Sequence, residues 1–275
     1  MTNLEEMLRQ EEFDKIWVKY CGFLDLNIKE FMQIQERLLM EQIELLSNCE
    51  LGQKIMGKGN KPTMVEEFRK TIPLTTYEDY ADILLNKKVE ALPSKPMYWI
   101  KNTWKGGTNE IKLAPYSESM IEEHTKSFIA SLILATSKKP GSFSLRQNDK
   151  FLYGMAPLPY LTGLAPYVLK NEINFEYLPS IEEAENLSFE ERNKVGFQLA
   201  SNKGADLFFG LSSVLVKIGE DFVKDSNGNK LSIKPKNFKM FYRLIKAFVK
   251  KYIKKEAILP KDLCEFKGIL CAGTD

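Results

Sequence analysis

The chain has 275 residues, of which 44% are hydrophobic and 28% are charged. This composition is typical of a folded globular protein and excludes a largely disordered chain. The 39 basic and 37 acidic side chains leave a formal net charge of +2, so we expect neither nucleic acid nor a membrane as a partner. Four scattered cysteines and one histidine form no metal-binding pattern, and we expect reduced thiols and no protein metal site.

The first 60 residues predict a helical lead-in. Apolar side chains recur at helical spacing from Leu4 to Leu46, which indicates two or three amphipathic helices. The N-terminus lacks the basic start and apolar run of a secretory signal, and no later window is long and apolar enough to cross a membrane. We therefore expect a cytoplasmic protein.

Two short helices are predicted next, at residues 65–70 and 75–85. Thr75 or Thr76 is expected to cap the second of them. The carboxylates of Glu78 and Asp79 fall in its first turn, where the helix dipole explains them without catalysis.

The segment from residue 97 onward predicts an α/β fold. A strand at 97–101, a glycine loop, a second strand and a helix are followed by strands at 150–159 and 172–180. The apolar strand Leu207–Phe209 leads into a helix that Ser212 or Ser213 is expected to cap. An apolar strand feeding a helix indicates a parallel sheet covered on both faces. We predict one α/β domain over residues 1–275, with a largely parallel sheet flanked by helices.

The C-terminal quarter contains a turn, a helix and a strand. Residues 225–230 predict a tight turn or hairpin. The helix predicted at 237–257 has aromatic residues on one stripe and lysines on the other, and a docked surface helix is favoured over a membrane or nucleic-acid face. A buried strand is predicted at 269–272.

The loop "NTWKGGTNEIK" (102–112) is the main candidate site. Glycine and threonine at Gly106, Gly107 and Thr108 would allow backbone N–H groups to face phosphate oxygens, and Lys112 would add positive charge. The Walker pattern and G-x-G-x-x-G are both absent. The residues alone therefore favour a plain hairpin turn over a phosphate site.

A resemblance changes this interpretation. The run "FRKTIPLTTYEDYADILLNKKVEALPSKPMYWIKNTWKGGTNEIKLAP" (68–115) resembles the N-terminal part of the auxin-responsive acyl-acid amido synthetases and their bacterial relatives. These enzymes belong to the adenylate-forming superfamily, which includes acyl-CoA synthetases and luciferase. In that family a "PLTTYEDY"-like segment precedes a hydroxyl- and glycine-rich phosphate loop that ends in lysine. The resemblance is looser elsewhere and covers only the N-terminal portion of the family.

The resemblance implies an ATP-dependent ligase that activates a carboxylate as acyl-AMP and transfers it to an amine or thiol. Thr103, Gly106, Gly107 and Thr108 would contact the phosphates, Lys112 would be the catalytic cation, and Mg²⁺ would bridge phosphate oxygens. The later family motifs lie beyond the chain, so we expect an N-terminal fragment that is inactive alone.

A non-catalytic module of the same fold, which would bind a small acid or a protein partner, remains the alternative. Trp104 and Lys105 stand where the family has a serine and a glycine. His124 is predicted to be an ordinary surface histidine, and the aromatic residues of 151–163 are predicted to be core residues more than the lining of an acyl pocket.

Overall fold

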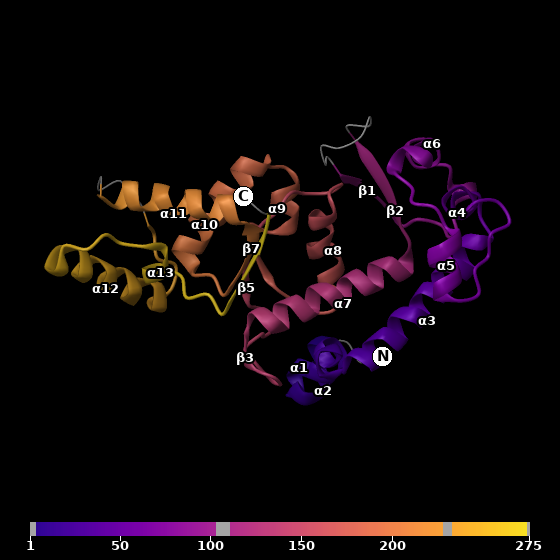
Figure 1. Ribbon diagram of the computed structural model, residues 1–275. Helices are drawn as coiled ribbons and strands as arrows, with labels where there is room; N and C mark the ends of the chain where they lie inside the picture. Colours follow the sequence, from indigo (N-terminus) through magenta and orange to yellow (C-terminus); the bar gives the residue numbers. More distant parts are fainter. Residues whose placement is uncertain (1–3, 103–110, 228–232, 274–275) are drawn as a thin grey trace. The chain divides into compact units, whose positions relative to one another are not determined.

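The computed structural model describes residues 4–102, 111–227 and 233–273 (Figure 1). The chain forms two compact units, described separately below. The sheet unit comprises residues 1–21, 126–157 and 162–275, and the hairpin unit comprises residues 22–125 and 158–161. The expectation of one domain stays a prediction.

The sheet unit contains most of the helices and six of the strands. Its helices are α1 (Leu4–Arg9), α2 (Phe13–Cys21), α8 (Ala165–Leu169), α9 (Ile181–Glu185), α10 (Phe189–Lys203), α11 (Ser212–Asn227), α12 (Phe238–Lys254) and α13 (Pro260–Leu263). Its strands are β3 (Ser137–Lys139), β4 (Ser142–Phe143), β5 (Lys150–Gly154), β6 (Glu176–Leu178), β7 (Leu207–Leu211) and β8 (Gly268–Ala272). The unit boundary falls within α7 (Glu118–Ala135).

A four-stranded parallel sheet organises this unit, which confirms the predicted fold class. Its strand order is β6-β5-β7-β8, and every pairing is parallel. The central strands β5 and β7 pair from Phe151 and Leu207 to Gly154 and Gly210. The chain leaves β5 toward β6 on one side and leaves β7 toward β8 on the other, so the topological switch point lies between the ends of β5 and β7.

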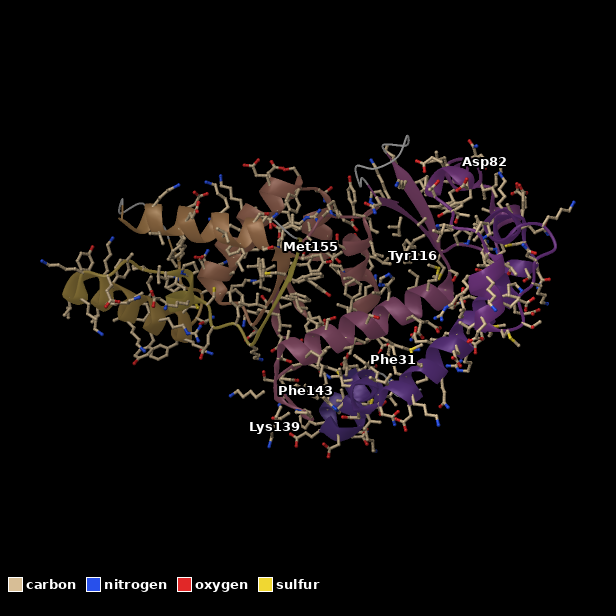
Figure 2. All side chains as sticks on the ribbon, in the orientation of Figure 1. Phe31, Asp82, Tyr116, Lys139, Phe143 and Met155 are labelled. Atoms are coloured by element: carbon tan, nitrogen blue, oxygen red, sulfur yellow. The ribbon has the colours of Figure 1, made fainter. Side chains whose placement is uncertain are left out.

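Each face of the sheet packs on its own core. Phe151 and Tyr153 join side chains of α1, α2, α7 and α8, and Phe143 lies in the same cluster (Figure 2). Leu152 follows Phe151 and Phe208 follows Leu207, so their side chains point to the opposite face of the sheet. There they pack against α10, α12 and α13. Since successive strand side chains alternate between faces, a fully apolar strand is buried on both sides.

A charged cluster lies where three parallel strands begin. Asp149, Asp206 and Lys267 immediately precede β5, β7 and β8. The Lys267 ammonium pairs with the Asp149 carboxylate, and its nitrogen lies 3.8 Å from an Asp206 oxygen. Burial raises the pKa of the Asp149 carboxyl, while the Lys267 hydrogen bond opposes this rise. The cluster is an internally satisfied part of the fold.

The hairpin unit is mostly helical. Its elements are η1 (Gly22–Asp25), α3 (Ile28–Ser47), α4 (Glu50–Met56), α5 (Val65–Thr71), η2 (Tyr77–Asp79), α6 (Ala81–Leu85), η3 (Val89–Ala91) and the antiparallel strands β1 (Tyr98–Asn102) and β2 (Lys112–Tyr116). Ile83 and Leu84 of α6, with Leu51 of α4, form its core. The helices predicted in the N-terminal third and the two strands are confirmed.

Three local predictions were wrong. Residues 225–227 belong to α11 rather than to a turn, and the rest of that predicted turn up to residue 230 lies outside the described residues. The strand β8 is not buried, because it is the edge of the sheet and Ile269 is 49% exposed. The aromatic stripe of α12 is exposed rather than docked.

Candidate phosphate-loop hairpin

The predicted phosphate loop connects the two strands of a hairpin. Asn102 at the end of β1 pairs with Lys112 at the start of β2. An antiparallel pair holds its two chains about 5 Å apart, so the two ends of the loop are fixed side by side. Thr103, Gly106, Gly107 and Thr108 lie outside the described residues, and their phosphate contacts stay predictions.

Lys112 is the predicted site residue that the structure describes. Its side chain is partly buried, and its ammonium nitrogen lies 5.6 Å from the centre of the Tyr77 ring. A cation over an aromatic face is attracted by the negative potential of the ring. The contact restricts the Lys112 side chain at the point where the loop rejoins the sheet.

Tyr77 is held against the same strand by its hydroxyl group. The Tyr77 hydroxyl accepts a hydrogen bond from the Leu113 N–H at 2.8 Å and donates to the Leu113 carbonyl at 3.2 Å. Tyr77 belongs to the "PLTTYEDY" run, so the structure brings the most specific motif to the end of the loop. Sequence reasoning missed this role of Tyr77, although its place in that motif was a signal.

The "PLTTYEDY" turn is itself ordered by a capping interaction. The Asp79 carboxylate accepts from the Thr76 N–H at 2.6 Å and from the Thr76 hydroxyl at 3.2 Å. The prediction that Thr76 and Asp79 are used in capping is confirmed. These bonds fix the backbone from which the Tyr77 side chain reaches β2.

The opposite strand of the hairpin has its own support. The Lys101 N–H donates to the Pro159 carbonyl at 2.8 Å, and Lys101 pairs with Tyr160 in a parallel bridge. The Lys101 ammonium lies 6.0 Å from the Tyr160 ring centre. Both strands that lead into the loop are therefore anchored to segments distant in sequence.

His124 lies in α7 beside β2. Its ring stacks on Tyr116 with 5.2 Å between ring centres, and its Nε2 atom is 3.3 Å from the Tyr116 hydroxyl. Burial lowers the pKa of the imidazole below its ordinary value. The residue is partly buried rather than on the surface, and the predicted ordinary, non-catalytic role fits this packing.

Ser212 and the aromatic residues that follow Lys150 have structural roles. Ser212 is the first residue of α11, and its hydroxyl donates to the Gly273 carbonyl at 3.1 Å, so the predicted capping role was wrong for Ser212. Phe151 and Tyr153 lie in the core of the sheet unit, as predicted for the aromatic residues of this segment.

The carboxyl ends of β5 and β7 show close packing. Gly154 and Gly210 pair in register there, and a Cβ at Gly154 would lie 2.7 Å from the Asn193 side-chain oxygen. Met155 follows β5 (Figure 2), and its carbonyl accepts a bond from the Arg192 guanidinium at 3.4 Å. Arg192 is 5% exposed and reaches only backbone carbonyls among the described residues.

The chain was compared with known families. Residues 22–155, nearly half of the chain, match the model of the GH3 family N-terminal domain. This match confirms the predicted resemblance for the N-terminal half of the chain. The matched segment includes "PLTTYEDY", the hairpin and the predicted loop.

A solved structure gives a weaker likeness to this chain. It is "AtGH3.15 acyl acid amido synthetase in complex with 2,4-DB", with 12% sequence identity and a TM-score of 0.47. The match covers 72% of this chain and 36% of that chain, so this chain spans about a third of the length of that structure. The comparison with curated proteins gives no significant match.

Among the described residues, no group of three or more His, Cys, Asp or Glu side chains is placed to hold a metal ion. No described helix has the length and apolar character needed to span a bilayer.

Proposed function

We propose that this chain supplies the phosphate-binding part of an acyl-adenylate-forming ligase. In the reaction a carboxylate oxygen attacks the α-phosphorus of ATP and pyrophosphate leaves. An amine or thiol then attacks the acyl carbon and AMP leaves. The observation that carries the proposal is the contact of Tyr77 with both Lys112 and Leu113, because it joins the family's motif to the loop.

The Lys112 ammonium places a positive charge where the loop rejoins β2, and this charge fits an anionic phosphate group. ATP would supply the phosphoanhydride, and Mg²⁺ would be held mainly by phosphate oxygens. In this proposal Lys112 offsets phosphate charge, and the amides of Gly106, Gly107 and Thr108, with Thr103, orient the phosphates.

Binding of Mg²⁺·ATP by the whole chain tests the proposal. Lys112→Ala should weaken the affinity about ten- to a hundredfold, since bonds to charged groups are worth more than neutral ones. Lys87→Ala is the matched control, because the Lys87 ammonium lies 5.8 Å from the Trp99 ring centre in the same unit. Unchanged affinity in both Lys112→Ala and Gly107→Val would reject the phosphate site.

Catalysis requires a separate measurement. Pyrophosphate release with a panel of carboxylic acids tests whether the chain activates a carboxylate, and hydroxylamine can report the acyl-adenylate. If the chain binds ATP but releases no pyrophosphate, the proposed phosphate-binding role stands and catalysis by this chain alone is rejected.

One observation favours a second function. Trp104 and Lys105 replace the small residues of the family loop, and bulky side chains hinder close approach of backbone to phosphate. The alternative is a non-catalytic module that binds a small acid or a protein partner. Binding of a carboxylic acid by calorimetry, without measurable ATP binding, would favour it.

A further inference from the structure

Helix α12 and its flanks concentrate the positive charge of the chain. Residues 234–255 include nine lysine or arginine residues and no acidic residue. The rest of the chain has 30 basic and 37 acidic residues, a formal charge of −7. An overall charge of +2 therefore conceals one strongly cationic segment in an acidic protein.

The same helix presents a large apolar surface to solvent. Only Met240 and Ala247 of α12 are buried, and they pack in the core beneath the helix. The exposed apolar side chains include four that are more than 60% accessible, namely Phe238 at 83%, Ile253 at 75%, Tyr252 at 68% and Tyr242 at 62%. Phe241, Ile245, Phe248 and Val249 are also exposed.

These exposed residues form one continuous face. At 100° per residue they occupy an arc of roughly 140°, opposite the buried Met240 and Ala247. By the same geometry Lys239 and Lys246 border this face on one side. A broad apolar face edged by lysines is typical of helices that lie in a bilayer interface, where the lysine stems cover apolar surface and the ammonium groups reach the headgroups.

Some of the basic side chains of α12 form ion pairs within the fold and others do not. Arg243 and Lys250 are neutralised within the fold by Glu265 and Asp262. Among the described residues, no carboxylate forms an ion pair with Lys239, Lys246 or Lys254. A second copy of the chain would bring the same cations together without a compensating carboxylate on the helix. An anionic lipid surface matches both the free cations and the apolar face.

We propose that α12 docks the protein on an anionic membrane, with the Phe241–Ile245 face inserted at the headgroup boundary and Lys239 and Lys246 at lipid phosphates. The proposed association is peripheral and reversible, because an interfacial amphipathic helix lies in the plane of the headgroups and does not cross the bilayer. This inference does not depend on the proposed phosphate site. Figure 1 shows α12 next to α13, at the far end of the sheet unit from α8.

Sedimentation of the whole chain with vesicles tests the proposal. Vesicles of phosphatidylcholine containing phosphatidylserine should bind the chain, and vesicles of phosphatidylcholine alone should bind much less. The doubly substituted variant Phe241→Ser, Ile245→Ser should lose at least about tenfold in partitioning, because two apolar side chains no longer enter the interface. The matched control is Phe31→Ser with Met32→Ser, a pair of similar exposure on α3.

A second set of variants tests whether electrostatic attraction to anionic lipids contributes to binding in addition to the hydrophobic effect. Lys239→Glu with Lys246→Glu should abolish the preference for phosphatidylserine, whereas Lys138→Glu with Lys139→Glu, the same charge change at exposed positions of β3, should not. Circular dichroism verifies that each variant is folded. Equal binding to both vesicle types, or equal binding by wild type and α12 variants, would overturn the proposal.

Other occupants of the face would give different results. Sedimentation velocity that shows a concentration-dependent dimer, lost in Phe241→Ser with Ile245→Ser and accompanied by no vesicle binding, would assign the face to a second copy. Retention by single-stranded RNA without vesicle binding would assign it to nucleic acid. Either result rejects the membrane proposal and has no bearing on the proposed phosphate site at Lys112.

Discussion

The parallel sheet and the β1–β2 hairpin use strands for different purposes. In β5 and β7 the side chains of Phe151, Leu152, Leu207 and Phe208 are each 1% exposed. In the hairpin every residue of β2 is only partly buried, and Ile100 is the buried residue of β1. Strands buried on both faces provide stability, whereas half-buried strands position a loop. Substitutions in the sheet should therefore change folding, and those in the hairpin should change binding.

The largest expected effect is in the core of the sheet. Phe208→Ala should reduce the free energy of unfolding by about 3–5 kcal/mol, since it removes a buried ring and leaves a cavity. Urea unfolding of the whole chain measures the change. Phe238→Ala, at a position 83% exposed, is the control and should be nearly neutral. Similar losses for both variants would contradict the stated role of the sheet.

The next largest effect is at the charged cluster that precedes the strands. Lys267→Met should lower the free energy of unfolding by about 2–3 kcal/mol at neutral pH. The substitution removes the cation that pairs with the Asp149 carboxylate, and Asp149 is only 4% exposed.

The pH dependence of this variant has a defined sign. Burial already raises the pKa of Asp149, and removal of Lys267 should raise it further. A carboxyl with a raised folded-state pKa favours folding most at low pH and loses that contribution as pH rises through the raised value. The difference in free energy of unfolding between wild type and Lys267→Met should therefore become smaller as the pH falls. A deficit that grows in acid would be inconsistent with this linkage.

A smaller effect is expected in the hairpin. Tyr77→Phe should lower the free energy of unfolding by about 1 kcal/mol, because the N–H and the carbonyl of Leu113 lose their hydrogen bonds to the Tyr77 hydroxyl. Hydrogen exchange at the Leu113 amide should accelerate, while exchange in β5 and β7 should be unchanged. Tyr242→Phe, in the exposed face of α12, provides the control. Unaltered exchange at Leu113 would show that Tyr77 does not support β2.

The smallest expected effect concerns the single histidine. His124 should titrate below its ordinary value of 6.5 in the folded protein, because burial disfavours the charged ring. A histidine whose pKa is lower in the folded state than in the unfolded state stabilises the fold at pH values above its unfolded-state pKa. This contribution is lost as the pH falls through the folded-state pKa. NMR titration of the folded and urea-unfolded chain compares the two directly. A higher pKa in the folded chain would refute the packing against Tyr116.

The sequence by itself determined the type of most elements, the parallel sheet and the resemblance to a known family. Leu207–Phe209 is apolar on successive residues, and that pattern requires burial on both faces wherever the strand lies. The "PLTTYEDY" run and the lysine after the glycine loop supplied the resemblance, because motifs depend on local order. The phosphate contacts predicted for Gly106, Gly107 and Thr108 stay predictions.

Tertiary structure alone decided which distant residues meet and which apolar faces are covered. The Tyr77–Leu113 bonds join residues 36 positions apart, and no local pattern specifies such a pairing. Helix α12 has apolar residues on two sides, so its periodicity could not reveal that Met240 and Ala247 are buried while Phe241 and Tyr252 face solvent. The physical reason is that periodicity identifies apolar side chains, whereas burial depends on the surfaces that the rest of the fold brings against them.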